Sequence, residues 1–245
     1  MVKRLTQQPV APLEILFRDQ HLIAVNKPPG LLVHRTRIAE AEDEDFVLQR
    51  LRSQIGHRVY TAHRLDRPTS GVLLFGLDSD AGRRLSQLFE DRAISKRYIA
   101  LVRGYTDERG EIDYALQDGP HQTARNAVTR YQRIATVELP FSVGRYPTSR
   151  YSLLQVDPLS GRYHQIRRHF HHIHHPLIGD TTHGEGRHNR FFREHFGIER
   201  LLLHAQALTF EHPYTGQPLS IGAAPDGQWR QLVQVLGWSA SVLTN

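Results

Sequence analysis

The stretch HRLDRPTSG, residues 63–71, contains the strongest local evidence for both fold and site in this chain. It places one carboxylate, Asp66, between Arg64 and Arg67, and nearby positive charge favours the ionised form of a carboxylate. The proline restricts the backbone, and the final glycine permits a sharp turn before an apolar run. The stretch therefore predicts a stiff turn that presents an ionised nucleophile or base just before a buried strand. For the four residues HRLD alone, a structural ion pair in a turn is the alternative.

Composition excludes several classes of protein. The chain has 245 residues, 39% hydrophobic and 23% charged, enough for one large or two small globular domains. It has no cysteine, which rules out disulfides, a thiolate nucleophile and a cysteine zinc site. No apolar run is long enough to cross a bilayer, and residues 1–8 lack the apolar core of a signal peptide. We expect a cytoplasmic protein without a membrane partner.

The charge balance is basic, with a net charge of +6 and a sequence pI of about 9.8. Only Lys3, Lys27 and Lys96 are lysines, so 28 of the 31 basic residues are arginines. Guanidinium groups pair with phosphate and stack on bases, which suits RNA contact. Codon bias in a GC-rich genome is the competing explanation. The basic balance by itself is weak evidence for a nucleic-acid partner.

The order of expected elements indicates an α+β fold. Strands outnumber helices and mostly follow one another without helical crossovers, which favours antiparallel pairing. Residues 105–150 are polar and turn-rich, with short strand-like pieces such as 128–131, and the acidic run 40–45 is typical of a solvated loop. We expect one domain over residues 13–238, with two subdomains at a cleft. The expected strands are 14–18, 22–26, 71–77, 98–102, 151–156, 201–210 and 219–223, and the expected helices are 47–55, 79–89, 164–173 and 229–236.

Histidines are concentrated in one region, with nine of the 16 between residues 164 and 195. His171 and His175 are four apart, a spacing that on a helix puts two imidazoles on one face, as a metal site needs. However, no acidic residue lies between Gln165 and Gly179 to complete the ligand set. The alternative is a basic helix and loop that line a groove for a polyanion. We expect no metal.

The segment GRYHQIRRH, residues 161–169, predicts the start of an amphipathic helix with Gln165, Arg168 and His169 on its outer face. Arg167 lies next to the apolar face, where a buried guanidinium needs a carboxylate partner. Asp66 is a candidate for that partner. A surface basic helix is the alternative.

A third segment, Lys96-Arg97-Tyr98, stands at the head of a predicted strand. A tyrosine at a strand mouth can stack on a base, or its hydroxyl can carry a proton. A half-buried strand residue without a chemical role is the commoner case.

Six motifs in order resemble those of the RluA family of pseudouridine synthases. They span most of the chain, and chance agreement of six ordered motifs is negligible. They are NKPPG (26–30), HRLDRPTSG (63–71), KRY (96–98), GRYHQIR (161–167), HPLIGD (175–180) and LHA (203–205).

The resemblance implies roles for individual residues. Asp66 matches the catalytic aspartate, Tyr98 the tyrosine that packs on the uracil and helps remove the C5 proton, and Arg167 the arginine that pairs with the aspartate. Arg64 matches the arginine that enters the RNA helix where the base has flipped out, and Ile166 an apolar wall of the base pocket. We also expect Leu65 in that pocket, and RNA contacts from Arg67, Arg162, His164, Gln165 and Arg168.

The same resemblance implies a fold and a reaction. The fold would be a mixed, mostly antiparallel sheet with flanking helices and a central RNA-binding cleft, and the reaction isomerisation of uridine to pseudouridine without cofactor or metal. Stretches outside the motifs, such as 17–28 and 143–148, are similar to family members that modify uridine 65 of tRNA. We expect a monomer that acts on tRNA and has no N-terminal S4 domain. A ribosomal RNA substrate and a non-catalytic RNA-binding protein are the alternatives.

Overall fold

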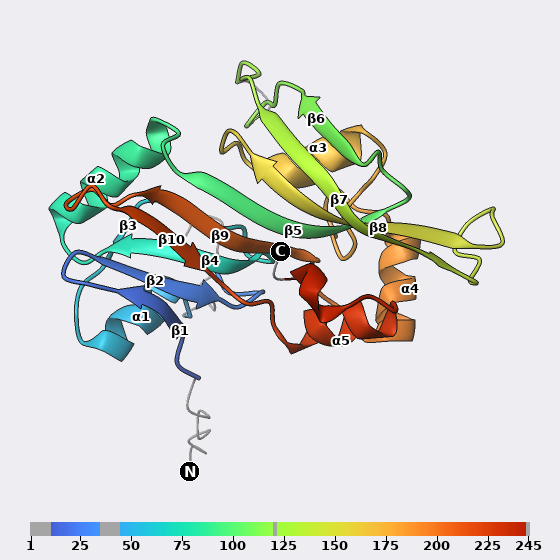
Figure 1. The fold of residues 1–245 in the computed structure, drawn as a ribbon, viewed down its shortest axis with the longest axis horizontal. Coiled ribbons are helices and arrows are strands. Elements are labelled where there is room, and N and C mark those ends of the chain that lie inside the picture. The colour runs from blue at the N-terminus through green and yellow to red at the C-terminus, as the bar shows by residue number, and fades with distance from the viewer. Residues whose placement is uncertain (1–10, 35–44, 120–121, 244–245) are drawn as a thin grey trace, which may run out of the picture.

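The chain folds around a sheet of ten strands with helices on both faces (Figure 1). The computed structural model describes residues 11–34, 45–119 and 122–243. Residues 1–8 and most of the acidic run 40–45 lie outside these ranges. The described elements are β1 (Glu14–Arg18), β2 (Leu22–Lys27), α1 (Val47–Ile55), β3 (Tyr60–Thr61), β4 (Ser70–Gly76), α2 (Ser79–Glu90), β5 (Ser95–Arg103), β6 (Arg109–Asp113), β7 (Val128–Leu139), β8 (Ser149–Pro158), α3 (Gln165–His172), α4 (Gly186–Phe196), β9 (Leu203–Glu211), β10 (Pro218–Gly222), α5 (Gly227–Val235) and the 3-10 helix Ala240–Leu243.

The α+β prediction is confirmed, and the strand order shows how the motifs come together. The main path is β1-β2-β4-β9-β5-β8-β7-β6, with β10 beside β9 and β3 beside β4. Among the named strands, all pairs are antiparallel except β4 with β9. The short parallel contact joins the two halves of the sheet, and Asp66 lies four residues before it.

Gly71 explains why this junction forms where the 63–71 stretch ends. Its φ is +112°, and a Cβ at this position would lie 2.1 Å from the carbonyl oxygen of Ala205 on β9. Only glycine allows this close approach of two backbones. The glycine that the sequence predicts as a turn is thus also the residue that brings the two half-sheets together.

Alternate residues of the central strands face opposite helices, so both faces of the sheet are buried. Ile23 and Leu73 pack with α1, whereas Leu22 and Leu74 pack with α2. In the other half, Leu101 and Leu153 pack with α4 and α5, whereas Val102 and Leu154 pack with α3. Strands buried on both faces carry continuous apolar runs, as β4 does from Val72 to Phe75.

Two parts of the chain differ from expectation. β7 runs over 12 residues rather than the short piece 128–131, because half-buried and exposed residues along it hide the strand pattern. The helix α4 was not predicted, since its arginines and histidines mask the buried Phe191 and Phe192. Both elements belong to the second half of the molecule, β7 as a strand of the sheet and α4 as a helix packed on it.

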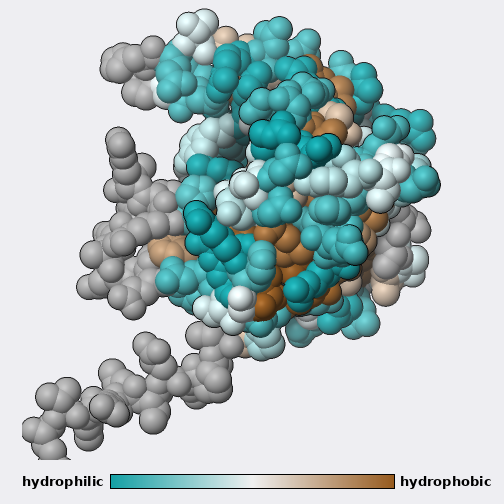
Figure 2. All heavy atoms as spheres, turned by 90° about the vertical axis from the view of Figure 1, so that its left-hand side faces the viewer, coloured by the Kyte–Doolittle hydropathy of each residue, from teal (hydrophilic) through white to brown (hydrophobic). Residues whose placement is uncertain are grey.

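The end of the molecule that carries α1, α2 and the β1–β2 and β9–β10 turns has a mostly hydrophilic surface, with hydrophobic side chains gathered near its middle (Figure 2). Among the described helices the longest, α2, has 12 residues, and none has the length and apolar character that crossing a membrane requires.

Candidate active site

His63 attaches the loop that carries Asp66 to strand β4. The Nε2 atom of His63 accepts the backbone N–H of Leu74 on β4 at 3.0 Å, and its ring stacks on Phe89 of α2. Burial, with a smaller contribution from the nearby Lys96 charge, lowers the pKa of His63 to about 3. The first residue of the motif is therefore a neutral imidazole that fixes the loop to the sheet.

Lys27 also contacts this loop, through the backbone next to Asp66. Its ammonium group is fully buried and donates to the carbonyl oxygens of Pro28, Leu31 and Arg67, at 2.8, 2.7 and 3.0 Å. Three acceptors match the three N–H bonds of an ammonium group, although burial and the charge of Arg200 lower the pKa of Lys27 to about 7. The NKPPG motif thus serves as a clamp on the Asp66 loop.

The carboxylate of Asp66 faces α3. Its Oδ2 lies 3.3 Å from Nη1 of Arg167 and 3.8 Å from Nε2 of His164, and the side chain is 20% exposed. The expectation that Arg167 and Asp66 meet is confirmed in the structure. Burial and the Asp66 charge both raise the pKa of Tyr98, so its phenol is neutral at ordinary pH.

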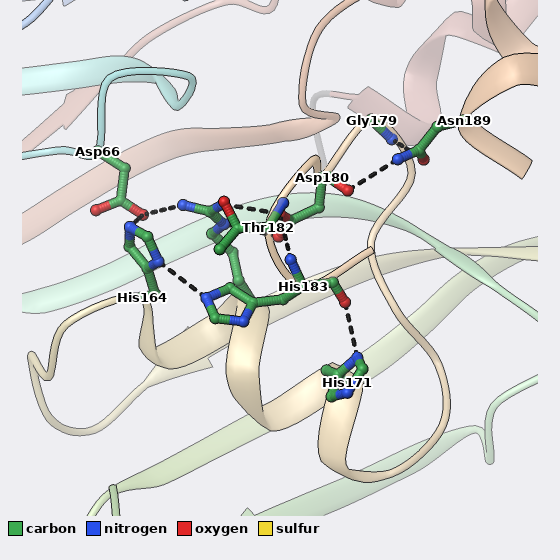
Figure 3. A network of polar contacts seen from close by, with 9 residues as sticks. Asp66, His164, His171, Gly179, Asp180, Thr182, His183 and Asn189 are labelled. Atoms are coloured by element: carbon green, nitrogen blue, oxygen red, sulfur yellow. Dashed lines mark hydrogen bonds and ion pairs between the residues drawn. The ribbon is translucent and has the colours of Figure 1, made fainter. Parts of the chain in front are cut away.

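Asp180 is the main partner of Arg167, which corrects the sequence argument. Nε and Nη2 of Arg167 donate to the two carboxylate oxygens of Asp180, both at 2.7 Å, and Asp180 also accepts the backbone N–H groups of Thr182 and His183 (Figure 3). Burial opposes ionisation of Asp180, but the hydrogen bonds from Arg167 and the backbone hold its pKa below the usual range. The buried guanidinium is fixed by Asp180, which leaves Nη1 for Asp66.

The loop of Asp180 is in turn held by α4. Asn189 donates from Nδ2 to the carbonyl oxygen of Asp180 and accepts the N–H of Gly179, both at 2.8 Å (Figure 3). The helix that sequence reasoning missed therefore positions the partner of Arg167.

His164 connects Asp66 to a second histidine. Its Nδ1 lies 2.9 Å from Nε2 of His183, as Figure 3 shows, and its φ of +52° is in the left-handed region that is uncommon for residues other than glycine. Burial is the largest cause that lowers the pKa of His164 to about 4. The ring is thus neutral at pH 7 and directed at Asp66.

The remaining histidines do not form the arrangement that a metal would need. The helix α3 ends at His172, so His171 and His175 do not share a helical face, and their Nδ1 atoms contact the carbonyl oxygens of His183 and Arg103. Within the described ranges, no group of three or more histidine or acidic side chains is placed to hold a metal ion.

A cavity of about 810 Å³ opens above Asp66. Tyr98 and Arg167 line it, together with the apolar side chains of Leu65 and Ile166. The predicted catalytic and base-pocket residues therefore share one cavity, a site with a carboxylate, a phenol and an apolar wall.

The residues expected to contact RNA divide into two groups. Arg64, Arg162 and His164 line the cavity, and Arg168 lies beside it on α3, half exposed. Arg67 is exposed but points elsewhere, with Nε donating to the carbonyl oxygen of Gly30.

The helical spacing predicts Gln165 and His169 on the outer face of α3, and this prediction is wrong. Both are buried. Gln165 accepts the hydroxyl of Ser160 and the N–H of Arg162, and donates to Val128 and Thr129. Its side-chain amide joins the loop before α3 to β7, because the first turn of the helix packs against that strand.

Comparison with known proteins identifies the relatives of this chain. A sequence model of the RNA pseudouridylate synthase family matches residues 21–172. The chain is 50% identical over 236 residues to the tRNA pseudouridine synthase C of Pectobacterium carotovorum. The match covers 92% of this chain and 62% of that protein, so the chain spans less than two thirds of that relative. It is 48% identical to the protein of the same name from Vibrio cholerae, with 95% and 99% covered.

The fold is that of solved pseudouridylate synthases as well. The human protein titled RNA Pseudouridylate Synthase Domain Containing 1 superposes with a TM-score of 0.68 at 24% identity, over 95% of this chain and 98% of that one. With a family match over more than half of its length and relatives near 50% identity, this chain belongs to the RNA pseudouridylate synthase family.

Proposed function

We propose that this chain isomerises uridine to pseudouridine in tRNA, at uridine 65, with Asp66 as the catalytic residue. The observation that carries the proposal is the carboxylate of Asp66, held 3.3 Å from a buried guanidinium in a cavity of about 810 Å³ with one apolar side. The names of the relatives support tRNA as substrate. Position 65 rests on the similarity outside the shared motifs. Residues 13–238 act as one catalytic unit, in keeping with a sheet that is continuous through both halves.

The cavity suits a base that has left its stack. A paired uracil cannot reach Asp66, so the nucleotide must flip out of the duplex, at a cost of a few kcal/mol. Leu65 and Ile166 offer apolar surface to the ring. In this proposal Arg64, which is exposed on the cavity, fills the space that the base leaves in the RNA.

The reaction exchanges bonds within one nucleotide. The N1–C1′ and C5–H bonds break, the C5–C1′ and N1–H bonds form, and no atom is gained or lost. Asp66 acts as nucleophile or as base at C2′, and either role needs the ionised carboxylate that Arg167 stabilises. The raised pKa of Tyr98 makes a free phenolate costly, which favours packing on the uracil as its main role and requires a partner if it takes the C5 proton.

The test is a comparison of the wild-type chain with Asp66→Asn. On tRNA labelled with tritium at uridine C5, we expect tritium release to fall at least about 10³-fold, since both proposed roles are lost. The dissociation constant for tRNA should change less than about threefold. Asp113→Asn, at an exposed aspartate on β6, is the control and should match wild type.

Three outcomes would contradict the proposal. Substantial turnover by Asp66→Asn removes Asp66 from its role. Turnover on ribosomal RNA but not on tRNA would show that ribosomal RNA is the substrate. If the wild-type chain releases no tritium from any RNA, it is a non-catalytic RNA-binding protein. A tRNA with cytidine at position 65 should release no tritium if that position is the target.

A further inference from the structure

One wall of the cavity carries positive charge that the protein does not neutralise. Arg92, just after α2, and Lys96, at the start of β5, line the cavity across from α3. Among the residues that the structure describes, the Arg92 guanidinium has no hydrogen bond or ion pair, and the Lys96 ammonium donates to a single carbonyl oxygen, that of Ser160. The mechanism above uses neither side chain.

The acidic residues of the cavity do not supply the missing partners. Asp66 is engaged by Arg167, and Asp118 pairs with Arg125. Glu90 is exposed at the end of α2 without an ion pair in the described part of the chain. Burial, together with the like charge of Arg92, lowers the pKa of Lys96 to about 8, so the two cations are close enough to repel each other. Like charges gathered in a cavity indicate an anionic ligand.

The backbone at Arg92 supports this reading independently. Arg92 has a φ of +59° and ends α2 with the bonds of a Schellman cap, in which the N–H of Ala93 donates to Leu88 and that of Arg92 to Phe89. Glycine is the usual residue at such a position, as Gly56 and Gly197 are after α1 and α4. An arginine here is strained and is not needed for the turn, although its charge does favour a helix C-terminus.

We propose that Arg92 and Lys96 bind a backbone phosphate of the RNA next to the flipped nucleotide. The inference rests on the proposed function, because it takes the cavity as the site of the target base. A nucleotide in the cavity brings its own phosphate and that of its neighbour to the rim. A guanidinium forms paired hydrogen bonds with phosphate oxygens, and an ammonium adds a point charge beside it.

The first test measures tRNA binding as a function of salt. Arg92→Gly removes the charge and suits the left-handed backbone, whereas Arg92→Gln removes the charge and keeps the strain. We expect both to weaken binding about 5- to 10-fold at 0.1 M salt and to reduce the slope of log K against log salt by about 0.7–0.9, the loss of one phosphate contact. Arg18→Gln, at an exposed arginine on β1, is the matched control and should leave both quantities unchanged.

The second readout separates binding from folding. If Arg92 serves only the helix end, Arg92→Gly should leave RNA binding unchanged. We expect weaker binding together with a midpoint of unfolding equal to or above that of wild type, so that the loss of binding is not a loss of folding. Single-turnover tritium release at saturating enzyme should stay within about threefold of wild type.

The third test identifies the ligand group. A tRNA with one neutral methylphosphonate beside the target uridine should bind wild type less tightly, and the loss should be smaller in Arg92→Gly, where only Lys96 remains to contact that phosphate. An unchanged salt slope in both Arg92 variants overturns the inference, as does an equal methylphosphonate penalty in wild type and variant at each flanking phosphate. Failure of the proposed function looks different, because the wild-type chain would then bind RNA and release no tritium.

Discussion

The two walls of the cavity hold their arginines in opposite ways. On the α3 wall, Arg167 is buried and makes three contacts of 3.3 Å or less with two carboxylates, Asp180 and Asp66. On the wall formed by α2 and β5, Arg92 is exposed and, within the described residues, has no such contact. A guanidinium whose position is fixed by the fold can orient a catalytic carboxylate, whereas one left without a partner is available to a ligand.

Arg167→Met gives the largest effect expected from this comparison. It leaves Asp180 as an uncompensated buried charge, which should lower the free energy of unfolding by about 3–5 kcal/mol. It also removes the contact to Asp66, so we expect tritium release to fall at least about 10²-fold. Chemical denaturation and single-turnover assays measure the two losses separately.

The double variant Arg167→Met/Asp180→Asn sharpens the result. The neutral amide no longer needs a cation, and its oxygen can still accept the N–H groups of Thr182 and His183. We expect most of the stability to return and the activity to stay low. Recovery of turnover in the double variant would mean that Arg167 serves folding alone.

The α3 wall should also make the protein sensitive to acid. Burial lowers the pKa of His164 to about 4, while the unfolded chain takes up this proton near the ordinary value of 6.5. Between these pH values the unfolded state binds more protons, so stability is complete above pH 6.5 and falls as the pH falls toward 4. His204, whose pKa burial also lowers to about 4, adds to the same slope.

Denaturation at pH 7.0, 5.5 and 4.5 measures this slope. His164→Gln should show a shallower loss of stability than wild type, while Arg92→Gln, on the other wall, should show the wild-type slope because arginine does not titrate in this range. Equal slopes in wild type and His164→Gln would show that His164 takes up its proton equally in both states.

Much of this site could be predicted from sequence because its parts are local. The 63–71 stretch carries its own turn chemistry, and the hairpin of β1 and β2 follows from its length and turn residues. The helix α1 follows from hydrophobic spacing, and α2 from hydrophobic spacing and its N-terminal cap. The contact between Arg167 and Asp66 followed from the cost of burying an unpaired guanidinium. The shared cavity of Asp66, Tyr98 and Ile166 was implied by the family resemblance and not by the residues alone.

The parts that could not be predicted depend on long-range packing. The loop that brings Asp180 to Arg167 is held by α4 through Asn189, and α4 itself is hidden by a basic composition. Gln165 is buried because the start of α3 packs on β7, which spacing within one helix cannot show. The left-handed φ of Arg92 leaves no signal, since sequence rules expect glycine there.

Glu90→Gln is the smallest and most specific way to examine the α2–β5 wall. Glu90 is the exposed carboxylate of this wall, and its charge opposes any phosphate that Arg92 and Lys96 attract. Exposed charges interact weakly, so we expect tRNA binding to tighten only about twofold at 50 mM salt. The gain should disappear at 0.5 M salt, and Glu194→Gln on α4 should not reproduce it.

Combining Glu90→Gln with Arg92→Gly decides how this wall works. If the two residues act on the same phosphate, removing the carboxylate should still tighten binding slightly when Arg92 is absent, because Lys96 remains. If instead Glu90 orients Arg92, its loss alone should weaken binding, and the variant pair should be no weaker than Arg92→Gly. That second pattern would mean that a carboxylate orients the arginine on the α2–β5 wall, as on the α3 wall. The two walls would then differ in how exposed their arginines are, and not in what holds them.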